Sequence, residues 1–195
     1  MMNTVIRLKY WLNLCKCIPT YFIIWLCNDE YLKKDVMRWR AILHEEVEDT
    51  SEMRSIGHFL VTKPEFRNLI IYRLKKKHVL AAGFLSVLWT KMPNLYIYTD
   101  QIGGGLFLQH GFSTIINAVS IGENCSIGQQ VTIGNNGAFK PVIQDNVTIS
   151  AGAIVIGNVV LHNSSLIGAG AVVTHDVPEN SIVAGVPARV IKQKG

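Results

Sequence analysis

The second half of this 195-residue chain places a branched aliphatic residue at every sixth position. A period of six, sustained over twelve repeats, needs a backbone that turns a corner after each repeat, as a parallel β-helix does. Three repeats make one triangular coil, so the pattern predicts a mainly β protein with about four coils. The predicted inward residues are Ile102, Leu108, Ile115, Ile121, Ile127 and Ile133, with a one-residue slip after Leu108, and then Ile143, Ile149, Val155, Leu161, Ile167 and Val173.

Small residues stand where such a helix would turn. Glycine directly follows the inward residue at Gly103, Gly122, Gly128, Gly134 and Gly168. Glycine accepts the tight backbone that a corner needs. A β-sandwich of short alternating strands is the alternative, but it offers no reason for a sustained period of six.

The positive charge of the chain lies mostly in its first half. Of the 19 Lys and Arg residues, 15 fall in residues 1–100, and the net charge is +5. The basic run at residues 73–78 contains no interleaved aromatic residues, and ten of the 14 carboxylates occupy the same half. A solvated helix end explains this pattern better than a nucleic-acid site, so no nucleic-acid partner is expected.

The four cysteines show neither a metal-ligand spacing nor a disulfide framework, which favours a reducing compartment, and we expect the cytoplasm. The apolar stretch 18–27 is about half the length of a bilayer span, and no signal-peptide cleavage site follows it. A helix lying on a membrane surface stays open as an alternative, although membrane association is not the expectation from sequence.

The chain divides into three predicted regions. Residues 1–94 are expected to be α-helical, with segments near 4–16, 29–44, 64–77 and 79–90. The sequence Thr62-Lys63-Pro64-Glu65 has the form of a capping box, which predicts a helix from about residue 63. Residues 95–177 form the β-helix, and residues 178–195 form a tail that caps its open end. Three flat faces favour assembly into a homotrimer.

Two features of the repeat are candidates for chemistry. Ten residues replace six between Ile133 and Ile143, which predicts a projecting loop of the kind that often builds a site on a rigid scaffold. His110 follows Leu108 by two positions, at an outer corner where a neutral imidazole can act as a general base. No two of the six histidines have metal-ligand spacing, so no metal is expected.

The hexads, the segment 102–110 (IGGGLFLQH) and the ending 184–189 (AGVPAR) resemble hexapeptide-repeat acyltransferases, and most of all serine O-acetyltransferases. The resemblance is best over residues 95–192 and weak over residues 1–60. It implies a left-handed parallel β-helix, a homotrimer or a dimer of trimers, and acetyl-CoA as co-substrate with a small hydroxyl acceptor.

The same resemblance implies roles for individual residues. His110 would be the base that removes the acceptor's hydroxyl proton during direct acetyl transfer. Ala151 and Ala169, eighteen residues apart, would lie along the pantetheine arm of the coenzyme. Arg189 and Lys192 would meet its nucleotide phosphates, and Asn135 is also assigned to coenzyme binding.

Some positions depart from the serine enzymes. Those enzymes carry an aspartate just before the catalytic histidine and another fifteen residues before it, where this chain has Gln109 and Leu95. Their longer loop ends in Arg-His-Pro-Lys-Ile, whereas this chain has Phe139-Lys140-Pro141. Gln109 and Lys140 are therefore our candidates for acceptor binding, Lys140 acting as a point charge on a carboxylate.

Three hypotheses for function follow. The first is a serine O-acetyltransferase that makes O-acetyl-L-serine for cysteine biosynthesis. The second is the same chemistry on a sugar hydroxyl in surface polysaccharide synthesis, favoured by the altered acceptor positions. The third is a trimer without catalytic activity, suggested by the missing acidic partners of His110.

Overall fold

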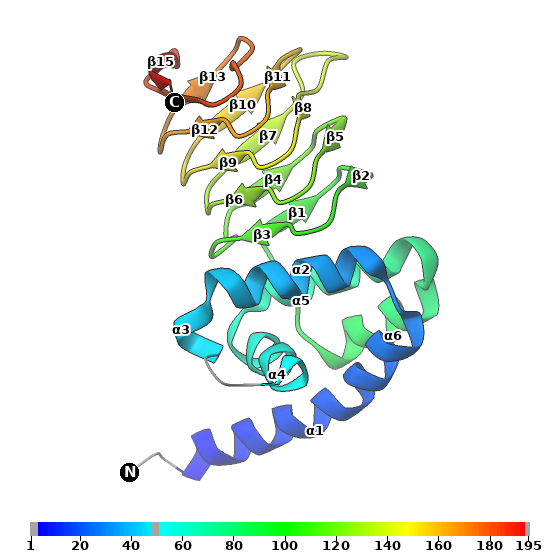
Figure 1. Cartoon of the computed structure of the whole chain (residues 1–195). Coiled ribbons are helices and arrows are strands. Elements are labelled where there is room, and N and C mark those ends of the chain that lie inside the picture. The colour runs from blue at the N-terminus through cyan, green and yellow to red at the C-terminus, as the bar shows by residue number, and fades with distance from the viewer. Residues whose placement is uncertain (1–3, 48–50, 194–195) are drawn as a thin grey trace. The chain divides into compact units, whose positions relative to one another are not determined.

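The computed structural model describes residues 4–47 and 51–193 (Figure 1). The chain separates into two compact units, Met1–Met92 and Pro93–Gly195, which are described one at a time. The first is helical and the second is a parallel β-helix, so the predicted fold class is confirmed. Within the described residues, no helix is long and apolar enough to cross a membrane.

The helical unit begins with one long helix rather than the shorter segment expected at 4–16. Helix α1 continues through Pro19, and its Thr20 hydroxyl donates to the carbonyl of Lys16 at 2.8 Å. The described helices are α1 (Thr4–Cys27), α2 (Glu30–Ile42), α3 (His44–Val47), α4 (Glu52–Thr62), α5 (Pro64–Lys77) and α6 (Val79–Leu88).

Side-chain caps start two of these helices. Asp29 accepts a hydrogen bond from the N–H of Leu32 at 2.9 Å and so begins α2. Ser51 does the same for α4. The capping box predicted at Thr62 is wrong, because Thr62 is the last residue of α4 and its hydroxyl donates to the carbonyl of His58. Pro64 still opens α5, as expected for a residue without an N–H.

The core of the helical unit is an aromatic cluster from three helices. Trp39 of α2, Phe59 of α4 and Phe66 of α5 are fully buried, with ring centroids 4.8 to 5.8 Å apart. Their tilted and edge-on contacts suit the charge distribution of aromatic rings. The cluster therefore holds α2, α4 and α5 together.

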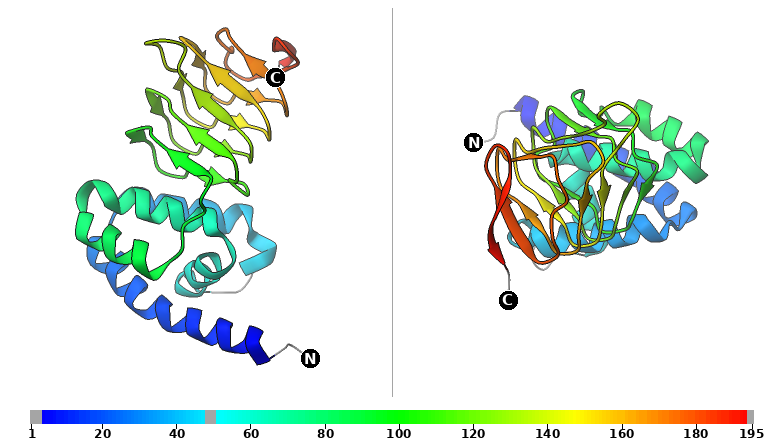
Figure 2. Two further views of the ribbon diagram at one scale, coloured as in Figure 1. Left: turned by 180° about the vertical axis from the view of Figure 1, so that it is seen from behind. Right: turned by 90° about the horizontal axis from the view of Figure 1, so that it is seen from above.

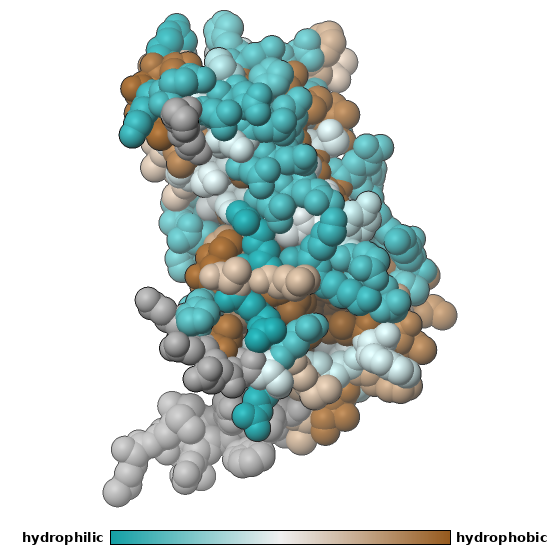
Figure 3. All heavy atoms as spheres, viewed as in Figure 1, coloured by the Kyte–Doolittle hydropathy of each residue, from teal (hydrophilic) through white to brown (hydrophobic). Residues whose placement is uncertain are grey.

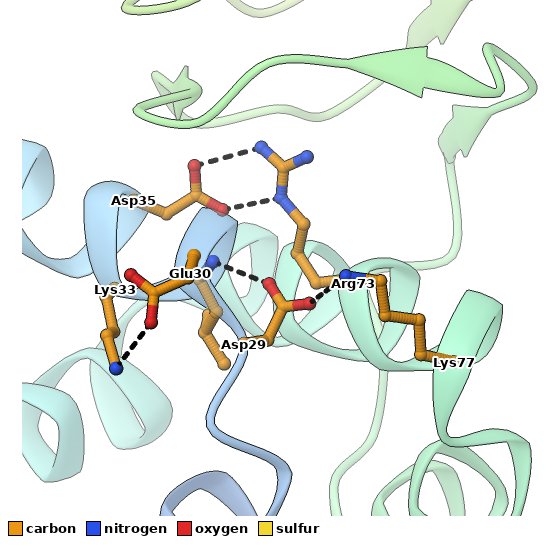
Figure 4. A network of polar contacts seen from close by, with 7 residues as sticks. Asp29, Glu30, Lys33, Asp35, Arg73 and Lys77 are labelled. Atoms are coloured by element: carbon orange, nitrogen blue, oxygen red, sulfur yellow. Dashed lines mark hydrogen bonds and ion pairs between the residues drawn. The ribbon is translucent and has the colours of Figure 1, made fainter.

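A buried ion pair joins α2 to α5 (Figure 4). The carboxylate of Asp35 accepts two hydrogen bonds from Arg73, from Nε at 2.7 Å and from Nη2 at 3.0 Å. The Asp35 side chain is fully buried and that of Arg73 is 4% exposed. Burial removes both charges from water, so each depends on the other for its solvation.

Replacing one residue of this ion pair should lower the stability of the protein strongly, whereas replacing both should lower it much less. We expect Asp35→Leu to lower the free energy of unfolding by about 3–5 kcal/mol, because it leaves the Arg73 charge buried and without its carboxylate. Adding Arg73→Met should recover most of that loss, since no buried charge remains. Urea unfolding followed by circular dichroism measures both. A double variant as unstable as the single one would contradict this account.

The second unit stacks its strands into three sheets, one on each side of the coil and parallel except at β15, as Figure 2 shows from two directions. The first face holds β1 (Leu95–Ile97), β4 (Thr114–Ile116), β7 (Thr132–Gly134), β10 (Ile154–Ile156) and β13 (Val172–Val173). The second face holds β2 (Gln101–Ile102), β5 (Ser120–Ile121), β8 (Val142–Ile143) and β11 (Val160–Leu161). The third holds β3 (Phe107–Leu108), β6 (Ser126–Ile127), β9 (Thr148–Ile149), β12 (Leu166–Ile167), β14 (Ser181–Ala184) and β15 (Arg189–Gln193).

The helix has about five coils rather than the expected four. The first face alone contains five strands, because β1 precedes the first complete hexad and pairs with β4. The final coil is completed by β14, which pairs in parallel with β12. Strand β15 then turns back and pairs antiparallel with β14. The start of the tail is thus a strand of the third face.

One predicted inward residue is wrong. Ile115 faces outward and is 38% exposed, whereas Ile116 is fully buried and pairs in register with Ile133. The interval between Leu108 and the next inward residue is therefore eight positions, and the following one, to Ile121, is five. Extra residues must project from the corner between β3 and β4.

Two glycines are required where coils approach each other at the corners between the third and first faces. A Cβ added at Gly128 would lie 2.8 Å from the backbone nitrogen of Ala151. One added at Gly168 would lie 3.1 Å from the Cβ of Ala184. These contacts show that the corner residues of successive coils are stacked closely on one another.

The close contact at Gly128 predicts that even a methyl group at this position lowers the stability of the protein. Gly128→Ala should lower the free energy of unfolding by about 1–3 kcal/mol, because its methyl group overlaps backbone atoms that cannot move aside without shifting the next coil. Gly134→Ala is the matched control, since its nearest atom, Cγ2 of Thr132, is 3.9 Å away. Thermal unfolding compares the two. Equal stability of both variants would show that the spacing between coils does not restrict the size of the side chain at position 128.

Candidate active site

His110 lies in an enlarged corner between β3 and β4. Leu108 pairs with Ile127 and Ile115 pairs with Thr132, so residues 109–113 stand opposite residues 128–130. The corner thus holds two residues more than the equivalent corner of the next coil. Because the strands on both sides keep their register, the excess can only project outward.

The backbone of this corner is left-handed at the position where Gln130, Gly152 and Gly170 of later coils also have positive φ, and at two further residues. His110 has φ 64°, Gly111 has φ 63° and Ser113 has φ 54°, all in the left-handed region. A side chain with a Cβ pays roughly 1–2 kcal/mol for that conformation. Such strain persists where the surrounding structure imposes it, and it is concentrated at functional sites. The exposed imidazole of His110 is therefore held out from a rigid coil.

The two predicted alanines lie on the same edge of the β-helix as His110. Hydrogen bonds connect this edge from coil to coil, from Gln109 N–H to the Ile127 carbonyl and from Gly128 N–H to the Ile149 carbonyl, each at 2.9 Å. The edge continues through Ala151 to Ala169, whose neighbour Gly170 donates to the carbonyl of Ala151 at 3.0 Å. With about 4.8 Å between coils, Ala151 is about 10 Å and Ala169 about 14 Å along the edge from His110.

Arg189 lies at the far end of this edge. It pairs with Ala184 across β14 and β15, and Ala184 packs over Gly168 of the preceding coil. Arg189 also lines a hollow of about 210 Å³ that His175 borders. Lys192 pairs with Ile182, further along the same strand, and both cationic residues are exposed. Their charges are thus available to an anionic group at this end of the edge.

Asn135 and Lys140 lie at a different corner. The enlarged loop between β7 and β8 folds into a small hairpin, in which Asn136 and Phe139 exchange backbone hydrogen bonds at 3.0 and 3.3 Å. The side-chain amide of Asn135 donates to the carbonyl of Gly137 at 2.8 Å. The projecting loop expected here is present, but the full width of the first face separates it from His110 within one chain.

The structure also places the positions that depart from the serine enzymes. Leu95 is buried inside the first coil, where it cannot contact His110 through a polar group. Asp100 lies between β1 and β2, at another corner of that coil. Gln109 is exposed beside His110 and is the polar side chain nearest to it in sequence. Within residues 4–47 and 51–193, no three His, Cys, Asp or Glu side chains gather as a metal site.

Sequence reasoning missed one aromatic residue at the His110 corner. Phe112 is 45% exposed and belongs to the same enlarged turn. Tyr96 and Tyr98 of the first coil are also exposed, and their rings stack with centroids 6.0 Å apart. The alternation of Tyr96 and Tyr98 is visible in the sequence, whereas the outward position of Phe112 follows only once the two extra residues are placed.

Residues 140–175 match the family model described as bacterial transferase hexapeptide (six repeats). A serine acetyltransferase of Bacillus licheniformis is 43% identical over 127 residues, covering 62% of this chain and 59% of its own. A serine acetyltransferase of Brucella abortus, solved in complex with coenzyme A, superposes with TM-score 0.65 at 28% identity, covering 89% of this chain and 72% of its own. The Neisseria gonorrhoeae enzyme, solved in complex with serine, gives TM-score 0.63 at 28% identity, with coverage of 84% and 68%.

The six-residue repeat, the stacked coils and the family match define a hexapeptide-repeat protein. Its sequence and fold are similar to those of hexapeptide-repeat acyltransferases, here the serine acetyltransferases just described. The chain spans about three fifths of the length of the curated relatives it matches.

Proposed function

We propose that this chain is an acetyl-CoA-dependent O-acetyltransferase that acts on L-serine, with His110 as general base. The observation that carries the proposal is the edge that begins at the projecting His110 and continues past Ala151 and Ala169 to Arg189. An extended thioester substrate could lie along such an edge and present its acetyl group to the imidazole. The relatives with coenzyme A and with serine bound support both substrates.

The chemistry assigned to His110 is proton transfer. Its neutral imidazole accepts the proton of the acceptor hydroxyl while the hydroxyl oxygen bonds to the thioester carbonyl carbon. The tetrahedral intermediate then collapses with cleavage of the carbon–sulfur bond. The leaving sulfur takes the proton back from the imidazolium, so the base is restored. Positioned proton transfer of this kind contributes about 10²–10⁴ to the rate.

The small residues on the edge suit the coenzyme. Ala151 and Ala169 leave room for an extended arm to approach the backbone closely. The carbonyl of Ala151 already accepts one hydrogen bond, and its second lone pair stays available. Arg189 and Lys192 would bind the phosphates at the far end, with Arg189 offering the planar, forked donors that phosphate prefers.

We propose that the protein acts as a homotrimer, alone or as a dimer of trimers. Ile115 and Ile154 of the first face are 38% and 37% exposed, so apolar surface there stands open to a neighbour. A neighbouring subunit could bring its loop, with Asn135 and Lys140, to the His110 edge that it does not reach within one chain. None of the four cysteines forms a disulfide, as the reducing cytoplasm that we propose for this protein would maintain.

A sugar hydroxyl is the second candidate acceptor. It is favoured by Phe112, whose exposed ring belongs to the same enlarged corner as His110 and could stack on a sugar ring. The absence of a carboxylate at Gln109 and Leu95 also removes groups that the serine enzymes carry. Gln109 offers an amide that can donate and accept hydrogen bonds with sugar hydroxyl groups.

Replacing His110 should remove catalysis without disturbing the fold. His110→Asn is the suitable variant, because asparagine tolerates the left-handed backbone at this position better than alanine does. We expect thiol release from acetyl-CoA to fall about a hundredfold or more, with an unchanged circular dichroism spectrum. His162→Asn, at another corner, is the control and should retain full activity. An undiminished rate in His110→Asn would exclude His110 as the base.

The acceptor is tested by a panel combined with Lys140→Ala. Saturable thiol release with L-serine, but not with free or nucleotide-linked sugars, would support the serine assignment. Lys140→Ala should then raise the KM for serine about tenfold, because a charge-assisted hydrogen bond to the carboxylate is lost, and leave the KM for acetyl-CoA unchanged. Release with sugars alone would reassign the acceptor, and no release with any acceptor would overturn the enzymatic proposal.

A further inference from the structure

Helix α1 exposes an apolar stripe along one side. Ile18, Phe22, Trp25 and Leu26 are 72%, 61%, 73% and 65% exposed, and their spacing of four, three and one residues places them on one side of a helix. The rings of Phe22 and Trp25 lie 6.1 Å apart. The opposite side of α1 is covered, since Cys17 and Thr20 are buried.

Helix α6 exposes a second apolar stripe. Val79, Leu80, Phe84 and Val87 are 65%, 88%, 51% and 90% exposed, while Ala82 and Leu85 are buried on the other side. The helix contains no charged residue. Large apolar side chains left open to water at this density indicate a surface that another apolar phase covers.

The two helices are packed against each other. The indole N–H of Trp89, directly after α6, donates to the hydroxyl of Thr20 at 2.9 Å. The ammonium of Lys16 lies over the Trp89 ring, 5.7 Å from its centroid. Figure 3 shows hydrophobic residues gathered over α6 and the C-terminal end of α1. We call the eight exposed residues of both stripes the apolar face.

Charge is segregated around this face. Residues 1–28 and 66–99, which supply α1 and α6, contain nine Lys and Arg and no Asp or Glu. Three exposed lysines, Lys75, Lys76 and Lys77, directly precede α6, and exposed Lys91 follows it. The carboxylates of the first hundred residues lie between 29 and 65 and at Asp100. Asp29 lies 3.7 Å from Lys77, and Glu52 lines the same hollow as Trp25, so the cationic part of the border is the one along α6, with Lys75, Lys76 and Lys91. An apolar face with such a cationic border is complementary to an anionic lipid surface.

We propose that the apolar face binds the surface of an anionic phospholipid membrane. Trp25, Phe22 and Phe84 would enter the boundary between headgroups and acyl chains, while the flanking lysines contact lipid phosphates. Each helix offers one side only, because its other side packs within the protein, so both lie along the surface. This binding is independent of the reaction proposed for His110.

A second copy of the chain fits the face less well. In a two-fold contact the same patch meets itself, so the lysines at 75–77 and at 91 would approach their own equivalents. The carboxylate of Asp29 already pairs with Lys77, and segments 1–28 and 66–99 contain no carboxylate that could neutralise Lys75 and Lys91. The charge distribution therefore selects lipid phosphates over a symmetric protein interface.

Vesicle flotation of the full chain tests the proposal. We expect the protein to float with vesicles of phosphatidylethanolamine and phosphatidylglycerol, and to remain below vesicles of phosphatidylcholine alone. Leu80→Glu combined with Val87→Glu should lower the partition coefficient about tenfold or more, because carboxylates would have to enter the apolar boundary. Lys75→Gln and Lys91→Gln should each lower it about fivefold. Met37→Glu, on an exposed position of α2, is the matched control and should bind like the unaltered protein.

A second readout reports the contact directly. Trp25 fluorescence should shift to shorter wavelength on addition of the anionic vesicles, and Trp25→Phe should abolish most of that shift. Failure of the unaltered protein to float, or equal loss in Met37→Glu, would overturn the proposal. So would a lower molar mass of the Leu80→Glu/Val87→Glu variant by light scattering with unchanged flotation, since the face would then join copies of the chain.

Discussion

The stacking of aliphatic side chains inside the β-helix determines everything that the second unit presents to solvent. Ile121, Ile143 and Leu161 occupy one register of the second face, and each is almost fully buried. Coils held at this spacing leave no freedom at the corners. An insertion therefore cannot be absorbed and has to project, which is why the two extra residues at His110 and the loop containing Lys140 stand out from a rigid body.

The period of six was sufficient to predict the fold class, but it could not resolve every register. Ile115 and Ile116 are adjacent isoleucines, and only the pairing of Ile116 with Ile133 shows which one points inward. The first and last coils were missed for a related reason. Leu95 and Val183 are buried in strands that lie outside the uninterrupted repeats. Leu95 falls within the predicted β-helix but in no hexad, and Val183 falls in the predicted tail, so a count of hexads omits both coils.

Some features of the candidate site could be predicted from the sequence, and others could not. A spacing of eighteen residues is one coil, so the common edge of Ala151 and Ala169 follows from the repeat. The left-handed backbone of His110 does not, because it results from an insertion between two strands of fixed register. Asn135 and Lys140 lie at a different corner from His110 within one chain. Their proposed role therefore depends on the proposed trimer, which no pattern within one sequence specifies.

In the helical unit, the feature that the sequence could not predict is which side of each apolar helix is exposed. The stretch 18–27 is apolar except for Thr20 and shows no clear helical period, so its sequence does not distinguish a buried helix from an exposed one. Burial of Thr20 by Trp89 divides the helix into a covered side and an open side that carries Phe22 and Trp25. Segments 1–28 and 66–99, which supply this open side and α6, contain no carboxylates. These segments therefore place no carboxylate beside the apolar face, and exposed Lys75 and Lys91 next to α6 can contact lipid phosphates.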